Sequence, residues 1–141
     1  MLAKNILIFF SFFLKLIVSA QDTAINSQQI DELKRQLAME KNDSIRTKIM
    51  EGLGFNYTVL NVDSAIKYTQ AGINLAQQKE LARNEASLLA TLSGIKSQQG
   101  KFAEALDLLF NSLKIAEDNN FRYDIARANR RLGGVYLDLE N

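Results

Sequence analysis

Apolar residues recur at intervals of three and four positions along most of the chain, which is the spacing that gives an α-helix one buried face. Polar breaks divide this pattern into helices expected at about residues 27–40, 44–60, 63–79, 82–98, 102–118 and 122–139. The breaks are short, and short loops force consecutive helices to run antiparallel. The sequence therefore predicts an all-α fold of antiparallel helix-turn-helix units.

The residues at the breaks have side chains that suit helix ends. Asn42 and Asn61 stand before the second and third predicted helices, where a side-chain oxygen can accept a hydrogen bond from a free backbone N–H. Gly100 can take the left-handed backbone of a tight turn, and Asn119-Asn120 can end the fifth helix in the same way. We therefore expect the helices to be joined by well-defined turns.

The chain resembles itself after a shift of 40 residues, which aligns Ala65 with Ala105. The flanking helical residues then match as well, in the pairs Ile66/Leu106, Ile73/Leu113, Leu75/Ile115 and Ala76/Ala116. The segment Leu53–Tyr57 likewise resembles Leu132–Tyr136, with a weaker copy at Leu92–Lys96. These correspondences predict repeated helix pairs, each with a first (A) and a second (B) helix, followed by a final A helix.

The middle of the chain carries the signature of a known repeat. Large, small and aromatic residues of the tetratricopeptide repeat (TPR) have counterparts at Leu92, Gly100, Phe102, Ala105, Leu109 and Ser112. Over roughly 43–141 the chain resembles this family, although its period is 40 instead of ~34 and the proline that usually ends the B helix is missing. The resemblance implies a TPR-like α-solenoid, a short array with an incomplete last repeat. Its expected units are a lead segment with an N-terminal helix at 21–43 and repeats at 44–81, 82–120 and 121–141.

The repeat register also predicts close helix contacts. Gly54 and Gly133 would lie where the partner helix crosses, because a small residue lets two helices approach closely. Tyr57 and Tyr136 would pack against the following helix or repeat.

Residues 1–20 have the layout of a secretory signal peptide. Lys4 precedes an apolar run, and small residues end at Ala20, after which we expect cleavage. The alternative is an inner-membrane anchor formed by residues 5–20, but Lys15 would cost about 2.5–3.5 kcal/mol in the middle of a membrane span. We therefore predict an exported protein, periplasmic or secreted, that touches a membrane only if this segment stays uncleaved.

Composition narrows the chemistry. The chain has no histidine and no cysteine, so it lacks the commonest general base, the commonest metal ligand and any thiolate. Without residues 1–20 it has 15 basic and 16 acidic side chains, and this balance gives no electrostatic case for nucleic acid. We expect no enzymatic activity, no metal and no cofactor, and a protein or peptide as the partner.

The TPR resemblance implies where such a partner would bind. Exposed positions of the A helices line a concave groove in this family, and the register transfers them to Lys48, Glu51, Phe55, Thr58, Ser87, Ala90, Ser97, Arg127 and Arg130. Arg127, Arg130 and Arg131 form a basic cluster on the last helix. It is either a solvated helix face or a clamp for carboxylates, which guanidinium groups bind well.

The last predicted helix is apolar on more than one side, and the sequence stops where the A-to-B turn of a third repeat would stand. Either the chain is a fragment of a longer repeat protein, or this surface serves self-association. The whole plan resembles the extracytoplasmic input region of bacterial sensor histidine kinases and related regulators. A truncated N-terminal sensory module of a two-component signalling protein is therefore the alternative to a free-standing scaffold.

Overall fold

The computed structural model describes residues 26–140, and this part of the chain is helical with no strand. Its helices span residues 26–39, α2 (Asp43–Tyr57), α3 (Val62–Gln78), α4 (Ala82–Gln98), α5 (Phe102–Asp118) and α6 (Arg122–Glu140). The all-α prediction is confirmed, and the largest difference in bounds is at α2, which ends at Tyr57 instead of residue 60. No described helix is both long and apolar enough to cross a membrane. The predicted signal peptide and its cleavage point lie outside the described residues.

The predicted caps form as expected. The side-chain oxygen of Asn42 accepts from the backbone N–H of Ile45 at 3.2 Å, and that of Asn61 accepts from Ser64 at 2.8 Å. Each bond satisfies a backbone donor that the first turn of the helix leaves free. The two asparagines therefore fix the starts of α2 and α3.

The turns after α3, α4 and α5 share one conformation. Glu80, Gly100 and Asn120 have left-handed backbones, with φ of 54°, 72° and 56°. The N–H of the next residue donates to a carbonyl five positions back, as from Lys101 to Lys96 at 2.9 Å, which is a common way to satisfy the last carbonyls of a helix. The expectations for Gly100 and for the asparagine pair are confirmed, and the turn at Glu80 is an addition.

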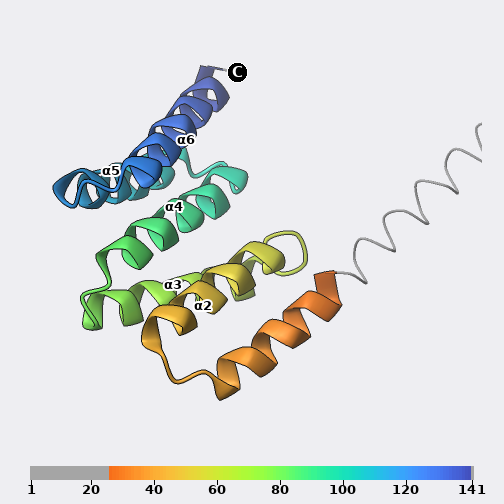
Figure 1. Cartoon of the computed structure of the whole chain (residues 1–141). Coiled ribbons are helices and arrows are strands. Elements are labelled where there is room, and N and C mark those ends of the chain that lie inside the picture. The colour runs from red at the N-terminus through yellow and green to blue at the C-terminus, as the bar shows by residue number, and fades with distance from the viewer. Residues whose placement is uncertain (1–25, 141) are drawn as a thin grey trace, which may run out of the picture.

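The helices stack as antiparallel pairs, α2 with α3 and α4 with α5, and α6 continues the stack (Figure 1). Ala65 and Ala105 are both fully buried, in equivalent places on α3 and α5, as the 40-residue correspondence requires. Buried side chains fill the space between each helix pair and the next, and a smaller cluster holds the N-terminal helix against α2 through Ile30, Ile49 and Leu53.

The contacts predicted from the register form in the first repeat. A Cβ added to Gly54 would collide with Thr69 Oγ1, so the absence of a side chain lets α2 cross α3 closely. The ring of Tyr57 stacks on that of Tyr68, with 5.6 Å between ring centres. On α6 the same prediction is wrong for the described residues. A Cβ on Gly133 would meet nothing within 4 Å, and Tyr136 is 48% exposed, because no described helix packs on this side of α6.

The A helices lie on the inner side of the stack. α2 packs on α4, and α4 packs on α6, whereas the backbones of α3 and α5 do not approach each other closely. The inner surface is therefore made by α2, α4 and α6, and side chains from all of them can converge there.

Candidate binding groove

One carboxylate joins the A helices across the inner surface. Glu51 Oε1 of α2 accepts hydrogen bonds from Ser87 Oγ and Thr91 Oγ1 of α4, both at 2.8 Å. Arg127 Nη2 of α6 approaches the same oxygen at 3.2 Å, and Arg127 Nη1 donates to Ser87 Oγ at 2.6 Å. Glu51 and Arg127 are 23% and 20% exposed, so water screens this ion pair only in part. We call these four residues the polar network.

A second set of polar contacts holds the same helices near their N-terminal ends. Asn84 Nδ2 of α4 donates to the carbonyl oxygen of Ser44 at 2.9 Å and to Thr47 Oγ1 at 2.6 Å on α2. Arg83 Nε donates to the buried Asp124 of α6 at 2.9 Å. Because the inner surface is fixed at two levels, its shape exists before any partner binds.

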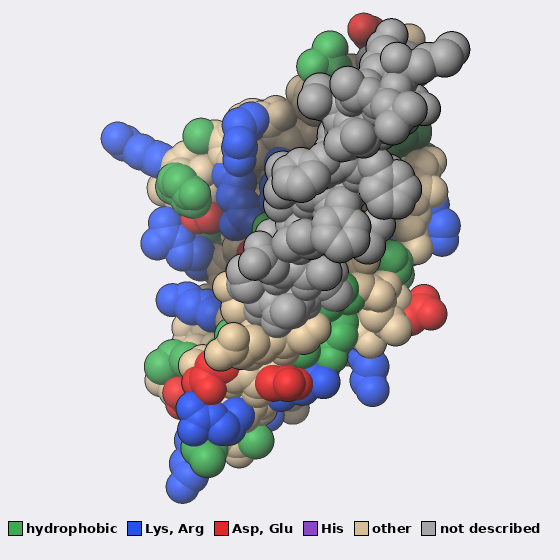
Figure 2. Space-filling model, turned by 90° about the vertical axis from the view of Figure 1, so that its right-hand side faces the viewer, with side chains coloured by type: hydrophobic (Ala, Val, Ile, Leu, Met, Phe, Trp, Pro, Cys, Tyr) green, Lys and Arg blue, Asp and Glu red, His purple; other side chains and the backbone are tan. Residues whose placement is uncertain are grey.

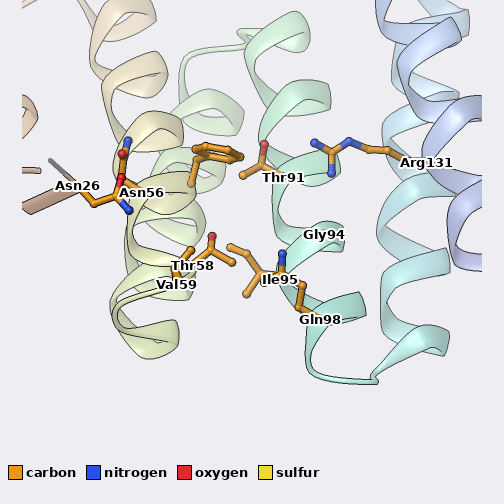
Figure 3. Close-up of a pocket in the computed structure, with 10 residues that line it drawn as sticks. Asn26, Asn56, Thr58, Val59, Thr91, Gly94, Ile95, Gln98 and Arg131 are labelled. Atoms are coloured by element: carbon orange, nitrogen blue, oxygen red, sulfur yellow. The ribbon is translucent and has the colours of Figure 1, made fainter. Parts of the chain in front are cut away.

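A cavity of about 180 Å³ lies beside the polar network, between α2, α4 and α6. Its described lining residues are Asn26, Phe55, Asn56, Thr58, Val59, Thr91, Gly94, Ile95, Gln98 and Arg131. Figure 3 shows Arg131 reaching from α6 towards Thr91 on α4, opposite Thr58 and Val59. The ring of Phe55 is 70% exposed although it lines the cavity, so an apolar surface is open to a ligand.

Arg131 is the unusual group of this cavity. Its Nε is buried and has no hydrogen-bond partner, and its Nη1 lies 2.8 Å from the place where a Cβ on Gly94 would stand. Burial lowers the pKa of Arg131, the charges of Arg127 and Arg130 lower that pKa further, and only Glu51 opposes them. The guanidinium therefore sits in a partly dehydrated, positive environment.

The structure brings part of the predicted groove together. Phe55 and Thr58 line the cavity, while Glu51, Ser87 and Arg127 belong to the adjoining polar network.

The remaining predicted positions stand apart from the cavity lining. Lys48 and Arg130 are exposed, and Ser97 is half-buried outside it. Ala90 is a correction, because only 2% of it is exposed and it packs against Leu132 where α6 covers α4, so no partner in the groove can reach it. Within the basic cluster, Arg127 is paired with Glu51.

Sequence reasoning missed Thr91 and Gly94 and did not place Arg131 in the groove. Thr91 stands four residues after Ser87, and Arg131 stands four residues after Arg127. Residues four apart on a helix lie on the same face, so this spacing was the available signal for both.

A family model described as the SusR N-terminal TPR domain matches residues 19–130. The chain belongs to this TPR family. The match includes the polar network and most of the cavity lining, and it ends one residue before Arg131. No curated protein matches the chain. TPR domains in general mediate protein–protein interaction and are typically non-catalytic scaffolds, and those of the SusR type are associated with extracellular or periplasmic proteins of bacteria.

Proposed function

We propose that the chain is an exported interaction scaffold that binds a peptide or a segment of a protein in the groove formed by α2, α4 and α6. The observation that carries this proposal is the cavity between these helices, whose lining includes both the exposed Phe55 and Arg131, whose buried Nε has no hydrogen-bond partner. Apolar walls with a few polar groups that fix orientation are typical of ligand sites.

The polar network supports the same proposal through its rigidity. Glu51 ties α2 to α4, and Arg127 ties α6 to both of them, so the protein loses little conformational freedom when a partner binds. A preformed surface loses less entropy on binding, and more of the contact energy then appears as affinity.

Export rests on the N-terminal residues. The apolar segment with Lys4 and the small residues before Ala20 is typical of a signal peptide, and the family match begins at residue 19, next to the expected cleavage point. Mass spectrometry of the protein recovered from the producing bacterium tests this directly. We expect an N-terminus at Gln21, and an intact residue 1 would favour the anchored alternative.

A sensory module is the second candidate, because the matching family is described as an N-terminal domain. In this case, binding of a partner in the groove would be the signal, and a domain that follows in the sequence would transmit it. The two candidates are separated by the coding sequence after Asn141. A membrane helix followed by a signalling domain would favour the sensor, and a stop codon would favour the free-standing scaffold.

Site-specific photocrosslinking tests the groove. A photoreactive phenylalanine analogue replaces Phe55 in the groove or, as the matched control, Phe110, which is 49% exposed on the B helix α5. Cells of the producing bacterium that carry either variant are irradiated, and adducts are identified by mass. We expect a discrete protein adduct at Phe55 and none of the same mass at Phe110. Equal adducts at both positions, or none at Phe55, would contradict a partner in the groove.

A further inference from the structure

The outer side of α6 carries exposed residues that no described helix covers. Gly133 lies there, and a Cβ on it would meet nothing within 4 Å. Steps of three and four residues keep side chains on one face of a helix, and such steps lead from Gly133 in both directions to further exposed residues. We call this set the outer stripe; it consists of Arg122, Ala126, Asn129, Gly133, Tyr136 and Glu140.

The outer stripe is separate from the candidate groove. Each residue of a helix is turned by about 100° from the one before it, so residues two positions apart point in nearly opposite directions. Arg127 bonds to α4 at the groove and lies two positions before Asn129. Arg131 lines the cavity and lies two positions before Gly133. Because α6 stands at one end of the stack, a partner on the outer stripe would extend the stack and leave the groove open (Figure 1).

The charges at the two ends of α6 are placed against the preference of a single helix. Its first residue is Arg122, its last is Glu140, and its last turn contains no basic residue. The N-terminal end of a helix is partially positive and the C-terminal end partially negative, so these two charges do not stabilise α6 by itself. Neither takes part in an ion pair within the described part of the chain. Figure 2 shows an acidic side chain at the top, where α6 ends in Figure 1, and Lys and Arg side chains gathered below it.

The outer stripe matches a second copy of itself in shape when the two helices run antiparallel. If Asn129 of one copy lies opposite Gly133 of the other, Ala126 lies opposite Tyr136. A small residue then faces a larger side chain at each of these positions, which lets two helices approach closely and interdigitate. The same contacts recur on both sides of a two-fold axis, as in most homodimers.

Two of the most exposed apolar side chains flank the outer stripe on one side. Tyr123 is 72% exposed and Leu137 is 63% exposed. In the antiparallel arrangement Tyr123 of each copy stands near Leu137 of the other, so the contact also removes apolar surface from water. Arg130 lies between them on this flank, where its long side chain can extend into water.

Charge decides the direction in which the second helix runs. The antiparallel arrangement that sets Asn129 opposite Gly133 also sets Arg122 opposite Glu140 of the second copy, at both ends of the contact. A parallel pair would bring each of these charges next to its like, which is unfavourable.

We propose that the outer stripe is a homodimer contact, in which α6 packs antiparallel on α6 of a second copy and Arg122 pairs with Glu140 at both ends. A pair of single helices is smaller than the contacts of about 1,200–2,000 Å² in stable complexes, so we expect a dissociation constant on the order of 10–100 μM. At low micromolar concentrations the chain is then mostly monomeric, and unfolding experiments report the single chain. The dimer presents two candidate grooves, which raises the avidity for a partner with two binding segments.

Sedimentation equilibrium of the protein purified from the producing bacterium measures the association at low salt, from about 5 μM to about 500 μM. We expect the mass to rise from that of one chain to that of two. Arg122→Glu should weaken the association about 10-fold, because each dimer then contains two pairs of like charges, and Glu140→Arg should do the same. The double variant exchanges the charges and should return the association to within about threefold of the wild type.

Two features make these charge variants informative. Both replacements suit the helix dipole, so neither should unfold α6, and the helical circular-dichroism spectrum checks this. Lys67→Glu is the matched control, because it changes the net charge as Arg122→Glu does but lies at an exposed position on α3. It should keep the association within about twofold of the wild type.

Disulfide formation tests which residues face each other. The chain has no cysteine, so Asn129→Cys and Gly133→Cys can be made as separate chains with different tags and mixed under oxidation. We expect a mixed disulfide, because facing residues of closely packed helices come within the Cα separation of about 4.4–6.8 Å that a disulfide needs. Gly134→Cys replaces Gly133→Cys in the control mixture, since the two glycines are adjacent and exposed but point about 100° apart.

Several results would overturn the proposal. One is a mass of a single chain at every concentration. Another is a dimer that the charge reversals leave intact or that the charge exchange does not restore. A mixed disulfide that forms as readily with Gly134→Cys as with Gly133→Cys, or with neither, would also contradict the antiparallel contact. None of these results bears on the proposed groove, which is tested separately at Phe55.

Discussion

The close crossing of α2 and α3 gives a sharp test of the repeat packing. Gly54 and Gly133 occupy equivalent places in the repeat register, each in the C-terminal half of an A helix. A Cβ at Gly54 would collide with Thr69 Oγ1 and approach the carbonyl oxygen of Ala65 at 3.4 Å, whereas a Cβ at Gly133 would meet nothing within 4 Å. The same substitution, glycine to alanine, should therefore have opposite effects at the two positions.

The magnitudes follow from two terms. Alanine is favoured over glycine inside a helix by about 1 kcal/mol, and this gain applies at both positions. Overpacking a buried contact costs about 1–3 kcal/mol, and only Gly54→Ala incurs it. Thr69 cannot simply rotate away, because it is fully buried and its hydroxyl donates to the Ala65 carbonyl at 2.8 Å. We expect Gly133→Ala to leave the free energy of unfolding unchanged or to raise it by up to about 1 kcal/mol. The free energy of unfolding of Gly54→Ala should be about 1–3 kcal/mol lower than that of Gly133→Ala.

The assay is urea unfolding followed by the helical circular-dichroism signal. An unchanged dependence of stability on urea shows that both variants report the same transition. Thr69→Ala provides the internal control, because it removes the oxygen that the new methyl group would strike and leaves a Cβ at 3.4 Å. In that background Gly54→Ala should cost about 1–2 kcal/mol less than in the wild type. Equal stability changes at Gly54 and Gly133, or no coupling with Thr69, would refute the close crossing.

Three further predictions test the network, a turn and an ion pair. Arg127→Met leaves the partly buried Glu51 without its cation and should lower the free energy of unfolding by about 1–2 kcal/mol, whereas Arg130→Met at an exposed position should change it by less than about 0.5 kcal/mol in the same urea assay. Glu80→Gly removes a side chain from a left-handed backbone and should raise the thermal unfolding midpoint slightly, with a gain of about 0.5–1 kcal/mol, and a loss would contradict the turn geometry. The hydrogen bond from Lys96, 2.7 Å away, lowers the pKa of Glu104, so carboxyl NMR titration should show that pKa rise towards its ordinary value in Lys96→Met. Because the folded pKa is the lower one, the contribution of this pair to stability is present above the ordinary carboxyl pKa and is lost as pH falls through the folded value.

Local chemistry made most of the fold predictable. Each of the predicted features depends on residues only a few positions away in the sequence, so it can be recognised from the sequence directly. These features are the asparagine caps, the glycine at the left-handed turn and the periodic apolar residues. Glu80 escaped prediction because glutamate has no preference for a left-handed backbone. The preceding helix and the Leu81 N–H bond to Ala76 at 2.8 Å impose that conformation from outside the residue.

The groove was less predictable because it depends on how the helices pack on one another. Register placed Ala90 on the open face, yet α4 is covered on more than one side, and the contact with Leu132 depends on the approach of α6. The arginines show the same limit. The sequence places Arg127 and Arg131 on one face of α6, but it does not reveal that Glu51, 76 residues before Arg127, pairs with one of them and not with the other.

That unequal pairing follows from how Glu51 is held on α4. If Glu51 had no contact with α4, it could move to either arginine, and the two charges would share one counterion. The hydroxyls of Ser87 and Thr91 hold its carboxylate at 2.8 Å, within reach of Arg127. The buried Nε of Arg131 is left without a hydrogen-bond partner, in the cavity lining that also contains the exposed Phe55. The polar network thus does two things at once: it fixes the A helices relative to each other, and it engages Arg127 while leaving Arg131 outside the network.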